Sequence, residues 1–514
     1  MAHKDTFTYL TSKFIRRHKA SVLGGLLLLL AIIAGLTGTL WQSHLAQVQR
    51  TKAEKRFNDV RKLANSNLFE VYPKVENLAG SLKARESILT NALQYLDSLA
   101  KESANDFELQ SELASGYEKV GDVQGALNNS SLGKTKAGLA TYRKANALRA
   151  TVLAARPNDF EAGEKLAENE YTIARTLWMD NQTKEAEEAF EKTLKLQREL
   201  VAAKPDAPAL RDKLAVTLID YAAIPAFNSQ SEKTLTLLNE ALAIIDQLQQ
   251  KDPANLTFKK TKARLLRLLS KPKAGLADYA GGLKALETAL VLSKEVAQEL
   301  TGDFRAQRAV WLTETMTCEL FIDQGDGAKA VEVGLRTIDF PKRALQKEPE
   351  NGVVAYDLAI SFFNLARAYR LVGNFQETIA NADAAIEVMS KLSAKSPEEA
   401  DYKRNLAIYK TEKARAEIAL SQSDEALSAL RDAEEIMQPI VAADPESATS
   451  QGDLGMTYRL QAQAFHQKGN DREAAELVDK AIDIVRRLND QKSLRDSEKD
   501  LLAELEKEKA TYRE

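Results

Sequence analysis

The sequence predicts an all-α protein in which one transmembrane helix precedes a right-handed α-solenoid of about eight 48-residue helical hairpins. Three observations support this fold class. Strong helix formers dominate the 514 residues, whereas Gly (23) and Pro (12) are scarce. A twenty-residue uncharged segment lies near the N-terminus. Prolines and small residues then recur with a fixed 48-residue period, which is typical of repeat proteins.

Charge and composition argue against several classes of function. The net charge is only −3, so no extended positive field is expected and nucleic acid is not a predicted partner. Cys318 is the single cysteine, which rules out an intrachain disulfide. Three of the four histidines lie in the first 44 residues, and no two of them have the spacing of metal ligands. We therefore expect no metal and no cofactor.

The uncharged segment runs from Ser21 to Leu40 and is long enough, as a helix, to cross about 30 Å of hydrocarbon. Secretory signals have a shorter apolar stretch followed by a cleavage site, whereas this segment ends at Trp41, a residue type common at membrane interfaces. We expect a retained transmembrane helix over residues 20–41. A cleaved signal peptide is the alternative.

Basic residues suggest how this helix is oriented. One group directly precedes the apolar segment, and residues 42–49 contain no Lys or Arg, although four basic residues follow at 50–56. The pattern predicts that residues 1–19 are cytoplasmic and that the repeats are periplasmic or extracellular, in a single-pass inner-membrane protein. Ala31, Gly35 and Thr39 share one helix face, which would allow a homodimer, although the pattern favours the simpler interpretation that they are ordinary small membrane residues.

A polar, helix-prone segment follows the membrane segment. We expect residues 42–80 to continue the membrane helix as a juxtamembrane stalk, with Pro73 and Gly80 marking its end. Apolar residues with helical spacing between Ile88 and Leu99 then predict a further helix at the start of the solenoid, which we assign to residues 81–492. Residues 493–514 are predicted to form a C-terminal capping helix through Leu494, Leu501, Leu502, Leu505 and Tyr512.

The repeat is defined first by its prolines. Most units place a proline beside Asp, Asn or Glu after a helical stretch, which predicts a helix end followed by a new helix start. The prolines are Pro157, Pro205, Pro253, Pro349, Pro397 and Pro445, with Thr301 at the one position that lacks a proline.

Small residues recur in the same register, as closely packed helical hairpins require. The first series is Ala174, Ala222, Ser270, Cys318, Ala366, Ala414 and Ala462. The second is Ala186, Thr234, Gly282, Ala330, Thr378, Ala426 and Ala474, and the third is Thr193, Ala241, Ala289, Thr337, Ala385, Ala433 and Ala481. Because Cys318 belongs to the first series, we interpret it as a packing residue and not as a reactive thiol.

These spacings resemble the tetratricopeptide repeat, and the best match is residues 364–375 (NLARAYRLVGNF), with a Gly373-Asn374 turn. Gly469-Asn470 and Gly121-Asp122 repeat that turn, whereas Asn181-Gln182 and Ser421-Gln422 replace it. Because the standard unit is shorter, at about 34 residues, the resemblance implies longer helices here. The first unit fits the register if a 12-residue insert, expected as an exposed loop, lies within residues 124–138.

Three blocks also resemble the C-terminal half of bacterial, acidobacterial-type membrane serine/threonine protein kinases: residues 13–20 (KFIRRHKA), 56–65 (RFNDVRKLAN) and 117–125 (YEKVGDVQG). The resemblance implies a cytoplasmic N-terminus and a sensor region. However, only the short segment 1–19 precedes the membrane helix, and the motifs of a kinase domain are absent. The chain is then either a stand-alone relative of the sensor half or a part of a longer protein.

A partner-binding groove is expected on the face lined by the first helix of each hairpin, because solenoids bind extended peptides or helices there. Its candidate residues follow the small positions and are Arg175, Trp178, Arg367, Arg370, Arg415 and His466. We expect a membrane-anchored scaffold or sensor module that binds a protein or peptide and catalyses no reaction. The alternatives are the non-catalytic half of a receptor-type kinase and an envelope-assembly or chaperone-like adaptor.

Overall fold

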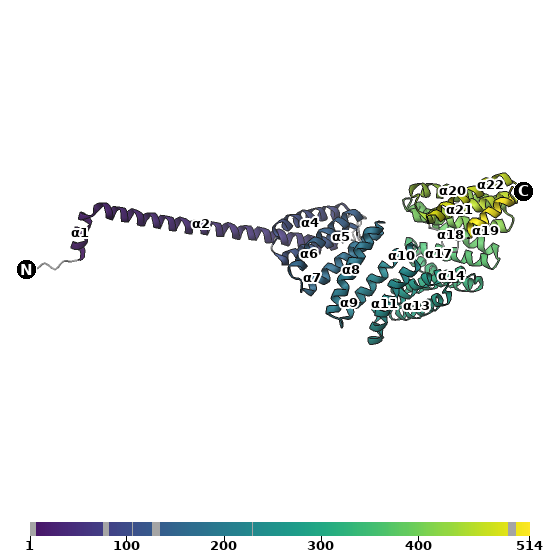
Figure 1. Ribbon diagram of the computed structural model, residues 1–514, viewed down its shortest axis with the longest axis horizontal. Helices are drawn as coiled ribbons and strands as arrows, with labels where there is room; N and C mark the ends of the chain where they lie inside the picture. The colour runs from purple at the N-terminus through teal and green to yellow at the C-terminus, as the bar shows by residue number, and fades with distance from the viewer. Residues whose placement is uncertain are drawn as a thin grey trace, which may run out of the picture. The chain divides into compact units, whose positions relative to one another are not determined.

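The computed structural model describes residues 7–75, 82–104, 106–125, 134–228, 230–491 and 500–513. Within these residues all regular secondary structure is helical, which confirms the predicted all-α class (Figure 1). The chain divides into two compact units, Met1–Ala189 and Phe190–Glu514, which are described in turn as unit 1 and unit 2. Gly80, Leu494 and most of the predicted insert at 124–138 lie outside the described residues.

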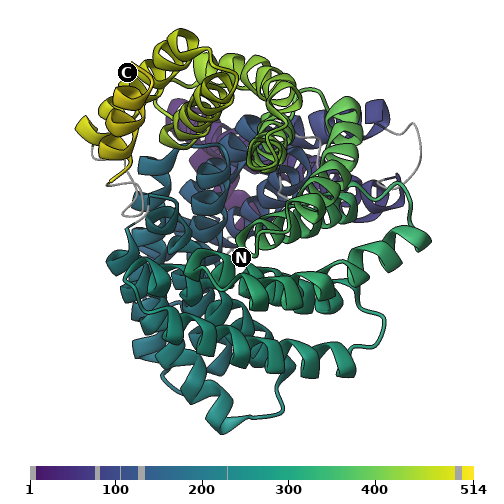
Figure 2. The same cartoon turned by 90° about the vertical axis from the view of Figure 1, so that its right-hand side faces the viewer.

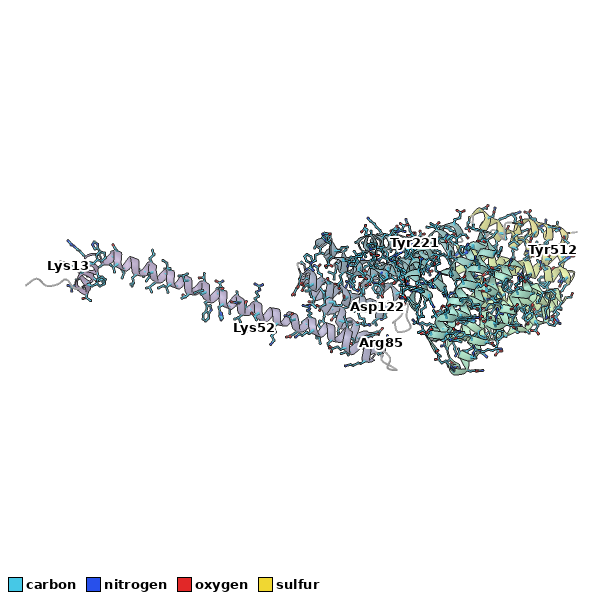
Figure 3. The ribbon with its side chains drawn as sticks, turned by 90° about the horizontal axis from the view of Figure 1, so that it is seen from below. Lys13, Lys52, Arg85, Asp122, Tyr221 and Tyr512 are labelled. Atoms are coloured by element: carbon cyan, nitrogen blue, oxygen red, sulfur yellow. The ribbon has the colours of Figure 1, made fainter. Side chains whose placement is uncertain are left out.

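Unit 1 begins with a short helix α1 (Phe7–Arg17) and the 47-residue helix α2 (Lys19–Asn65). An 18-residue window within Lys19–Lys52 has a mean hydropathy of 2.4 and no buried residue, so this helix is long and apolar enough to cross a membrane. Lys13 and Lys52 stand on either side of the apolar stretch (Figure 3). The apolar segment and the polar residues that follow it therefore form one unbroken helix.

The end of α2 is attached to the helices that follow it. A π-helical turn (Ser66–Val71) and the short α3 (Tyr72–Val75) place Leu68 and Tyr72 in a core with residues of α4 (Leu82–Glu102) and α5 (Phe107–Gly125). Both side chains are fully buried. On α2 itself, Arg61 Nε donates a hydrogen bond to Glu112 Oε1 of α5 at 2.9 Å. The helix thus ends at Asn65, before Pro73, and its last turns cover the first hairpin.

The remaining helices of unit 1 are α6 (Thr135–Ala155), α7 (Phe160–Met179) and the first residues of α8 (Thr183–Ala203). Helices α5 and α6 pack as a hairpin. Gly121-Asp122 does not form the hairpin turn that the sequence predicts, because α5 continues to Gly125 and Gly121 is buried inside it. A Cβ at Gly121 would lie 2.6 Å from the ring of Tyr142, so this glycine permits close packing of α5 and α6.

Unit 2 is a stack of helical hairpins, each with a first and a second helix. The first helices are α9 (Pro208–Tyr221) with α10 (Ala223–Phe227), α12 (Leu256–Gly275), α14 (Phe304–Gln324), α17 (Gly352–Leu371), α19 (Ala400–Ala419) and α21 (Ala448–Gln467). The second helices are α11 (Ser231–Lys251), α13 (Tyr279–Glu299), α15 (Gly327–Thr337) with α16 (Asp339–Lys347), α18 (Phe375–Lys395), α20 (Ser423–Ala443) and α22 (Asp471–Asp490). In Figure 2 these hairpins follow one another in chain order, from teal to yellow.

The helix starts confirm the 48-residue period. From Pro208 to Ala448, every first helix begins one such period after the previous one, and the second helices do the same from Ser231 to Asp471. The hairpin turns also recur at this spacing, because each needs a residue with a left-handed backbone. In the turns of unit 2 that the structure describes completely, these residues are Ala277, Gly325, Gly373, Ser421 and Gly469, with φ between 59° and 83°.

Two helices of unit 2 are interrupted at prolines. Pro225 lies in the short α10 that continues α9, and Pro341 lies in α16, which continues α15. A proline has no N–H to donate to the carbonyl four residues earlier, and for Pro341 this carbonyl belongs to Thr337. The Oγ of Ser361 lies 3.1 Å from that oxygen and donates to it instead. The break in the helix is thus compensated by a side chain of the next hairpin.

Candidate partner-binding face

The first helices of unit 2 form its inner face. Throughout the described part of the unit, consecutive first helices contact one another more extensively than consecutive second helices do. A stack whose first helices lie closer together curves towards them. We call the surface formed by α12, α14, α17, α19 and α21 the inner face, and it corresponds to the side on which the sequence predicts a groove.

The small residues lie where the hairpins pack most closely. Every member of the three series is buried, and the members of the first series are 0–2 % exposed. The Sγ of Cys318 on α14 lies 3.3 Å from the carbonyl oxygen of Ala330 on α15, so the first and second series meet across a hairpin. Burial raises the pKa of the Cys318 thiol to about 12. This thiol is consequently a poor nucleophile at neutral pH.

Ion pairs connect successive first helices along the inner face. Each pair joins residues 42 to 49 positions apart, which the backbone brings together only because one hairpin stacks on the next. Two nitrogens of Arg308 donate to the fully buried carboxylate of Asp357, at 2.6 and 2.8 Å. The others are Lys271–Glu319 (2.8 Å), Arg367–Asp323 (3.4 Å), Arg370–Glu412 (2.5 Å), Arg404–Asp453 (2.6 Å) and Arg459–Glu508 (2.6 Å).

Two predicted groove residues, Arg367 and Arg370, therefore take part in this series. Arg367 also lies over the ring of Phe363, with its guanidinium carbon 5.8 Å from the ring centre. Arg370 donates to Glu412, whose side chain is only 9 % exposed. A buried carboxylate needs such a cation, so Arg370 has a structural function in addition to any role in binding, whereas Asp323, the partner of Arg367, is itself exposed.

Arg415 on α19 differs from the other predicted arginines. Its Nε is buried and makes no hydrogen bond; it lies 3.9 Å from Oε2 of Glu412, the carboxylate whose Oε1 accepts a hydrogen bond from Arg370. Burial lowers the pKa of Arg415, the Glu412 carboxylate opposes this shift, and Arg370, Arg459 and Arg367 add to it. The side chain remains about one-third exposed. It is a partly open cation near other cations, and it shares the Glu412 carboxylate with Arg370.

The last predicted groove residue of unit 2, His466, lies near the hairpin turn that ends α21. Its Nδ1 is 2.5 Å from Asp471 Oδ1, at the start of α22, and its ring packs 4.7 Å from that of Tyr512. Both contacts lie at the C-terminal end of the stack. The structure thus brings Arg367, Arg370 and Arg415 together, and it places His466 at the end of its helix.

Arg175 and Trp178 belong to unit 1, on α7. The guanidinium carbon of Arg175 lies 5.6 Å from the ring centre of Tyr171, and Arg175 is exposed whereas Trp178 is half-buried. These two residues are four and one positions from the end of α7 at Met179. They form a separate candidate surface on unit 1.

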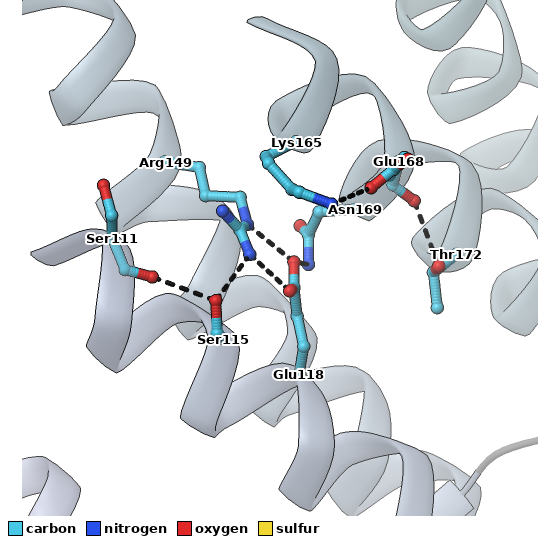
Figure 4. Close-up of polar contacts among 8 residues, drawn as sticks. All are labelled: Ser111, Ser115, Glu118, Arg149, Lys165, Glu168, Asn169 and Thr172. Atoms are coloured by element: carbon cyan, nitrogen blue, oxygen red, sulfur yellow. Dashed lines mark hydrogen bonds and ion pairs between the residues drawn. The ribbon is translucent and has the colours of Figure 1, made fainter. Parts of the chain in front are cut away.

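The sequence analysis missed two polar clusters because their partners are distant in sequence. In unit 1, Arg149 is 6 % exposed and binds Glu118 through two nitrogens, at 2.7 and 2.5 Å. Asn169 donates to the same carboxylate at 3.0 Å (Figure 4). On the inner face of unit 2, Arg459 of α21 binds Glu504 and Glu508, which lie on the C-terminal helix α23 (Leu501–Thr511). The first cluster joins α5, α6 and α7, the second joins α21 to α23, and both stabilise the packing of these helices.

The inner face presents charged side chains and hydrogen-bond donors to a ligand. The described residues contain no group of three or more His, Cys, Asp and Glu side chains placed to hold a metal ion. The chemistry that the face does present is that of guanidinium groups, which bind carboxylates through two parallel hydrogen bonds.

Comparison with known proteins gives the following results. No family model matches the chain, and no curated protein matches its sequence. Among solved structures, the chain is similar to BtubC from P. vanneervenii, with 19 % identity, 50 % of this chain and 92 % of that chain covered and a TM-score of 0.38. It is also similar to the apo form of RapI, with 14 % identity, coverage of 84 % and 99 % and a TM-score of 0.46. A tetratricopeptide repeat protein from Parabacteroides merdae matches at 11 % identity, coverage of 68 % and 98 % and a TM-score of 0.35.

Proposed function

We propose that this protein is a membrane-anchored helical-repeat scaffold that binds an acidic segment of a partner protein on the inner face of unit 2. The observation that carries the proposal is the state of Arg415. Its guanidinium has a buried Nε that makes no hydrogen bond, and three further arginines lie close enough to lower its pKa. A partially desolvated cation of this kind is costly for the folded chain by itself, and a carboxylate that binds the exposed third of the Arg415 side chain would offset that cost.

The neighbouring residues favour an acidic ligand over a basic one. Arg367, Arg370 and Arg459 lie close enough to lower the pKa of Arg415, and each already binds a carboxylate of a neighbouring first helix or of α23. A ligand carboxylate could therefore bind Arg415 without displacing these pairs. A basic ligand would have to compete with the arginines for Glu412. Several such contacts along the face would select an extended peptide with spaced Asp or Glu residues.

Membrane anchoring rests on α2. Its apolar stretch is fully exposed in the described structure, which is costly in water and favourable in a bilayer. We infer a single crossing with the N-terminus in the cytoplasm, because Lys13, Arg16, Arg17 and Lys19 directly precede the apolar segment. The repeats would then act on the opposite side of the inner membrane.

Selection of peptides from a random display library by the full chain in lipid nanodiscs tests the binding proposal. We expect the selected peptides to be enriched in Asp and Glu. Arg415→Ala should weaken binding of these peptides by about tenfold or more, as loss of a charge-assisted pair does. Because Arg415 Nε has no protein acceptor, this variant should fold normally, which circular dichroism checks.

The matched control is Arg431→Ala, which removes an exposed arginine from the second helix α20. Its peptide binding should equal that of the parent chain. Equal losses in the two variants, or peptides without acidic enrichment, would refute the assignment of the inner face.

A finer proposal is that the chain is the sensor part of a receptor-type serine/threonine kinase system. It is supported by the resemblance of residues 13–20, 56–65 and 117–125 to such proteins. An adjoining coding region for a kinase domain, continuous with this one or translated with it, would support this proposal. Isolation of the full-length native protein without associated kinase activity would count against it.

A further inference from the structure

Helix α1 (Phe7–Arg17) has two chemically different faces. At 100° per residue, Phe7, Leu10 and Phe14 fall within an arc of about 60°, Arg16 lies on the opposite side, and Lys13 and Arg17 border the apolar arc next to Leu10. The apolar residues are strongly exposed: Phe7 is 86 %, Leu10 51 % and Phe14 59 % accessible. Within the described chain, the ring of His18 packs 4.9 Å from that of Phe14, and every described side chain of α1 nevertheless remains exposed.

A helix of this length needs support from outside itself. Eleven residues are fewer than an isolated helix requires for stability in water, because nucleation is costly. Helices this short normally persist because an apolar face is buried against something else. The apolar face of α1 therefore calls for an apolar surface that the described residues of the chain do not provide.

The position of α1 indicates what this surface is. The backbone leaves the helical region at His18 (φ −127°, ψ 40°), and α2 begins at the next residue. Figure 1 shows α1 turning away from the axis of α2 at this point. The apolar stretch of α2 begins only a few residues later, so α1 joins the membrane segment at its end. If α2 crosses a bilayer, then α1 lies at the bilayer surface.

The charges of this region match a negatively charged surface. Four cations, Lys13, Arg16, Arg17 and Lys19, lie close together in sequence, and no Asp or Glu occurs from Phe7 to Ala53. A short amphipathic helix with aromatic and aliphatic residues on one side and Lys or Arg on the other is the type that lies in the plane of a membrane. Basic residues near the membrane bind anionic lipid headgroups.

We propose that α1 is an interfacial helix that lies in the cytoplasmic leaflet of the membrane crossed by α2 and binds anionic phospholipids. Phe7, Leu10 and Phe14 insert among the upper acyl chains, while Lys13 and Arg16 contact the lipid phosphates. This inference rests on the proposed membrane anchoring. It adds a lipid-binding surface, and it implies that the lipid composition of the leaflet sets the orientation of α1 relative to α2.

The test places a fluorescent NBD label on either face of α1 in the full chain. A Cys318→Ala background removes the native thiol, and alanine occupies the equivalent position in most other units. Leu10→Cys carries the label on the apolar face, and Ser12→Cys carries it on the polar face as the matched control. Both chains are reconstituted in vesicles that mix phosphatidylcholine with a minor fraction of phosphatidylglycerol, and in vesicles of phosphatidylcholine alone.

Quenching by spin-labelled lipids and by aqueous iodide reports the depth of each label. We expect lipid quenching at position 10 to exceed that at position 12 by about threefold, because interfacial helices bury their apolar face about 5–10 Å below the headgroup boundary. The difference in lipid quenching between positions 10 and 12 should be smaller in vesicles of phosphatidylcholine alone. It should also shrink when Lys13→Glu and Arg16→Glu are added in the vesicles with phosphatidylglycerol.

Equal aqueous quenching at positions 10 and 12 in both lipid mixtures would overturn the inference. Resistance to alkaline carbonate extraction, measured on the same vesicles, separates this failure from a failure of the anchor. A chain that resists extraction but shows no difference between the two labels has a membrane helix without an interfacial α1. A chain that carbonate removes from the vesicles refutes both proposals.

Discussion

At the scale of single residues, the described hairpin turns of unit 2 each contain one residue in the left-handed backbone conformation, but this residue is not always glycine. Gly325, Gly373 and Gly469 adopt the left-handed conformation without a side chain to hinder it, whereas Ala277 and Ser421 adopt it at φ 63° and 59°. A Cβ in this region crowds the following carbonyl. Two of these turns therefore contain local strain that glycine would remove.

We expect Ala277→Gly to raise the free energy of unfolding by about 0.5–1 kcal/mol, and Gly373→Ala to lower it by about 1 kcal/mol. A Cβ at Gly373 would have no heavy atom within 4 Å, so the backbone conformation alone accounts for the second effect. Urea denaturation of the detergent-solubilised full chain measures both changes. Destabilisation by Ala277→Gly would contradict the explanation.

Cys318 gives a second prediction at this scale. Because burial raises its pKa to about 12 from an ordinary value of 9.0, its thiolate fraction at pH 8 should be about a thousandfold smaller than that of an ordinary cysteine. Labelling with Ellman's reagent should accordingly be very slow without denaturant and fast in urea. The control is Glu425→Cys in a Cys318→Ala chain, which places an exposed thiol on α20. Similar labelling rates for the two thiols in the folded protein would contradict the buried position.

At the scale of helices, the sequence was sufficient to locate most elements of the repeat. Prolines and small residues recur because every hairpin needs a turn and close contacts between its helices. Because each hairpin has the same requirement, it appears in the sequence as a repeated pattern. Other features depend on partners in the next hairpin. The special state of Arg415 arises because Glu412 is occupied by Arg370, 42 residues away from that glutamate. Spacing alone could not distinguish Arg415 from Arg370.

The Gly121-Asp122 prediction was wrong for a related reason. Glycine serves both turns and close helix contacts, and the sequence does not show which of the two applies. Here a Cβ at Gly121 would overlap the ring of Tyr142. The glycine is therefore a packing residue, and α5 continues past it to Gly125.

Gly282 allows this packing role to be tested in unit 2. A Cβ there would lie 2.9 Å from the carbonyl oxygen of Ser270 and 3.1 Å from Leu320 Cδ2. Since a backbone atom of the paired helix cannot easily move, we expect Gly282→Ala to destabilise the protein by about 1–3 kcal/mol. Gly452→Ala is the control, because a Cβ there meets nothing within 4 Å and should stabilise α21 by about 0.5–1 kcal/mol. Thermal or urea denaturation distinguishes the opposite signs, and stabilisation by Gly282→Ala would refute the close contact.

At the scale of the whole molecule, unit 2 is held together mainly by contacts between neighbouring hairpins. Each of its apolar core clusters is formed by residues from helices that are adjacent in the stack. In such an array, stability is approximately a sum of hairpin and interface terms, and the end of the array needs a cover. Helix α23 provides it at the C-terminus, where Leu505 and Tyr512 join the core formed with α21 and α22.

Weaker packing of α23 should therefore destabilise only the helices near the C-terminal end of unit 2. Leu505 is 1 % exposed, and Leu505→Ala should weaken the last interface by about 2–4 kcal/mol, as for other buried leucines. Hydrogen exchange followed by mass spectrometry should show faster exchange in α21, α22 and α23, with little change in α12 and α13, because α23 packs mainly against α22 at the far end of the stack. Lys507→Ala on the exposed side of α23 should leave all rates unchanged. Uniform acceleration throughout unit 2 would instead mean that its hairpins unfold as one cooperative body, and the nearest-neighbour description of this stack would then be wrong.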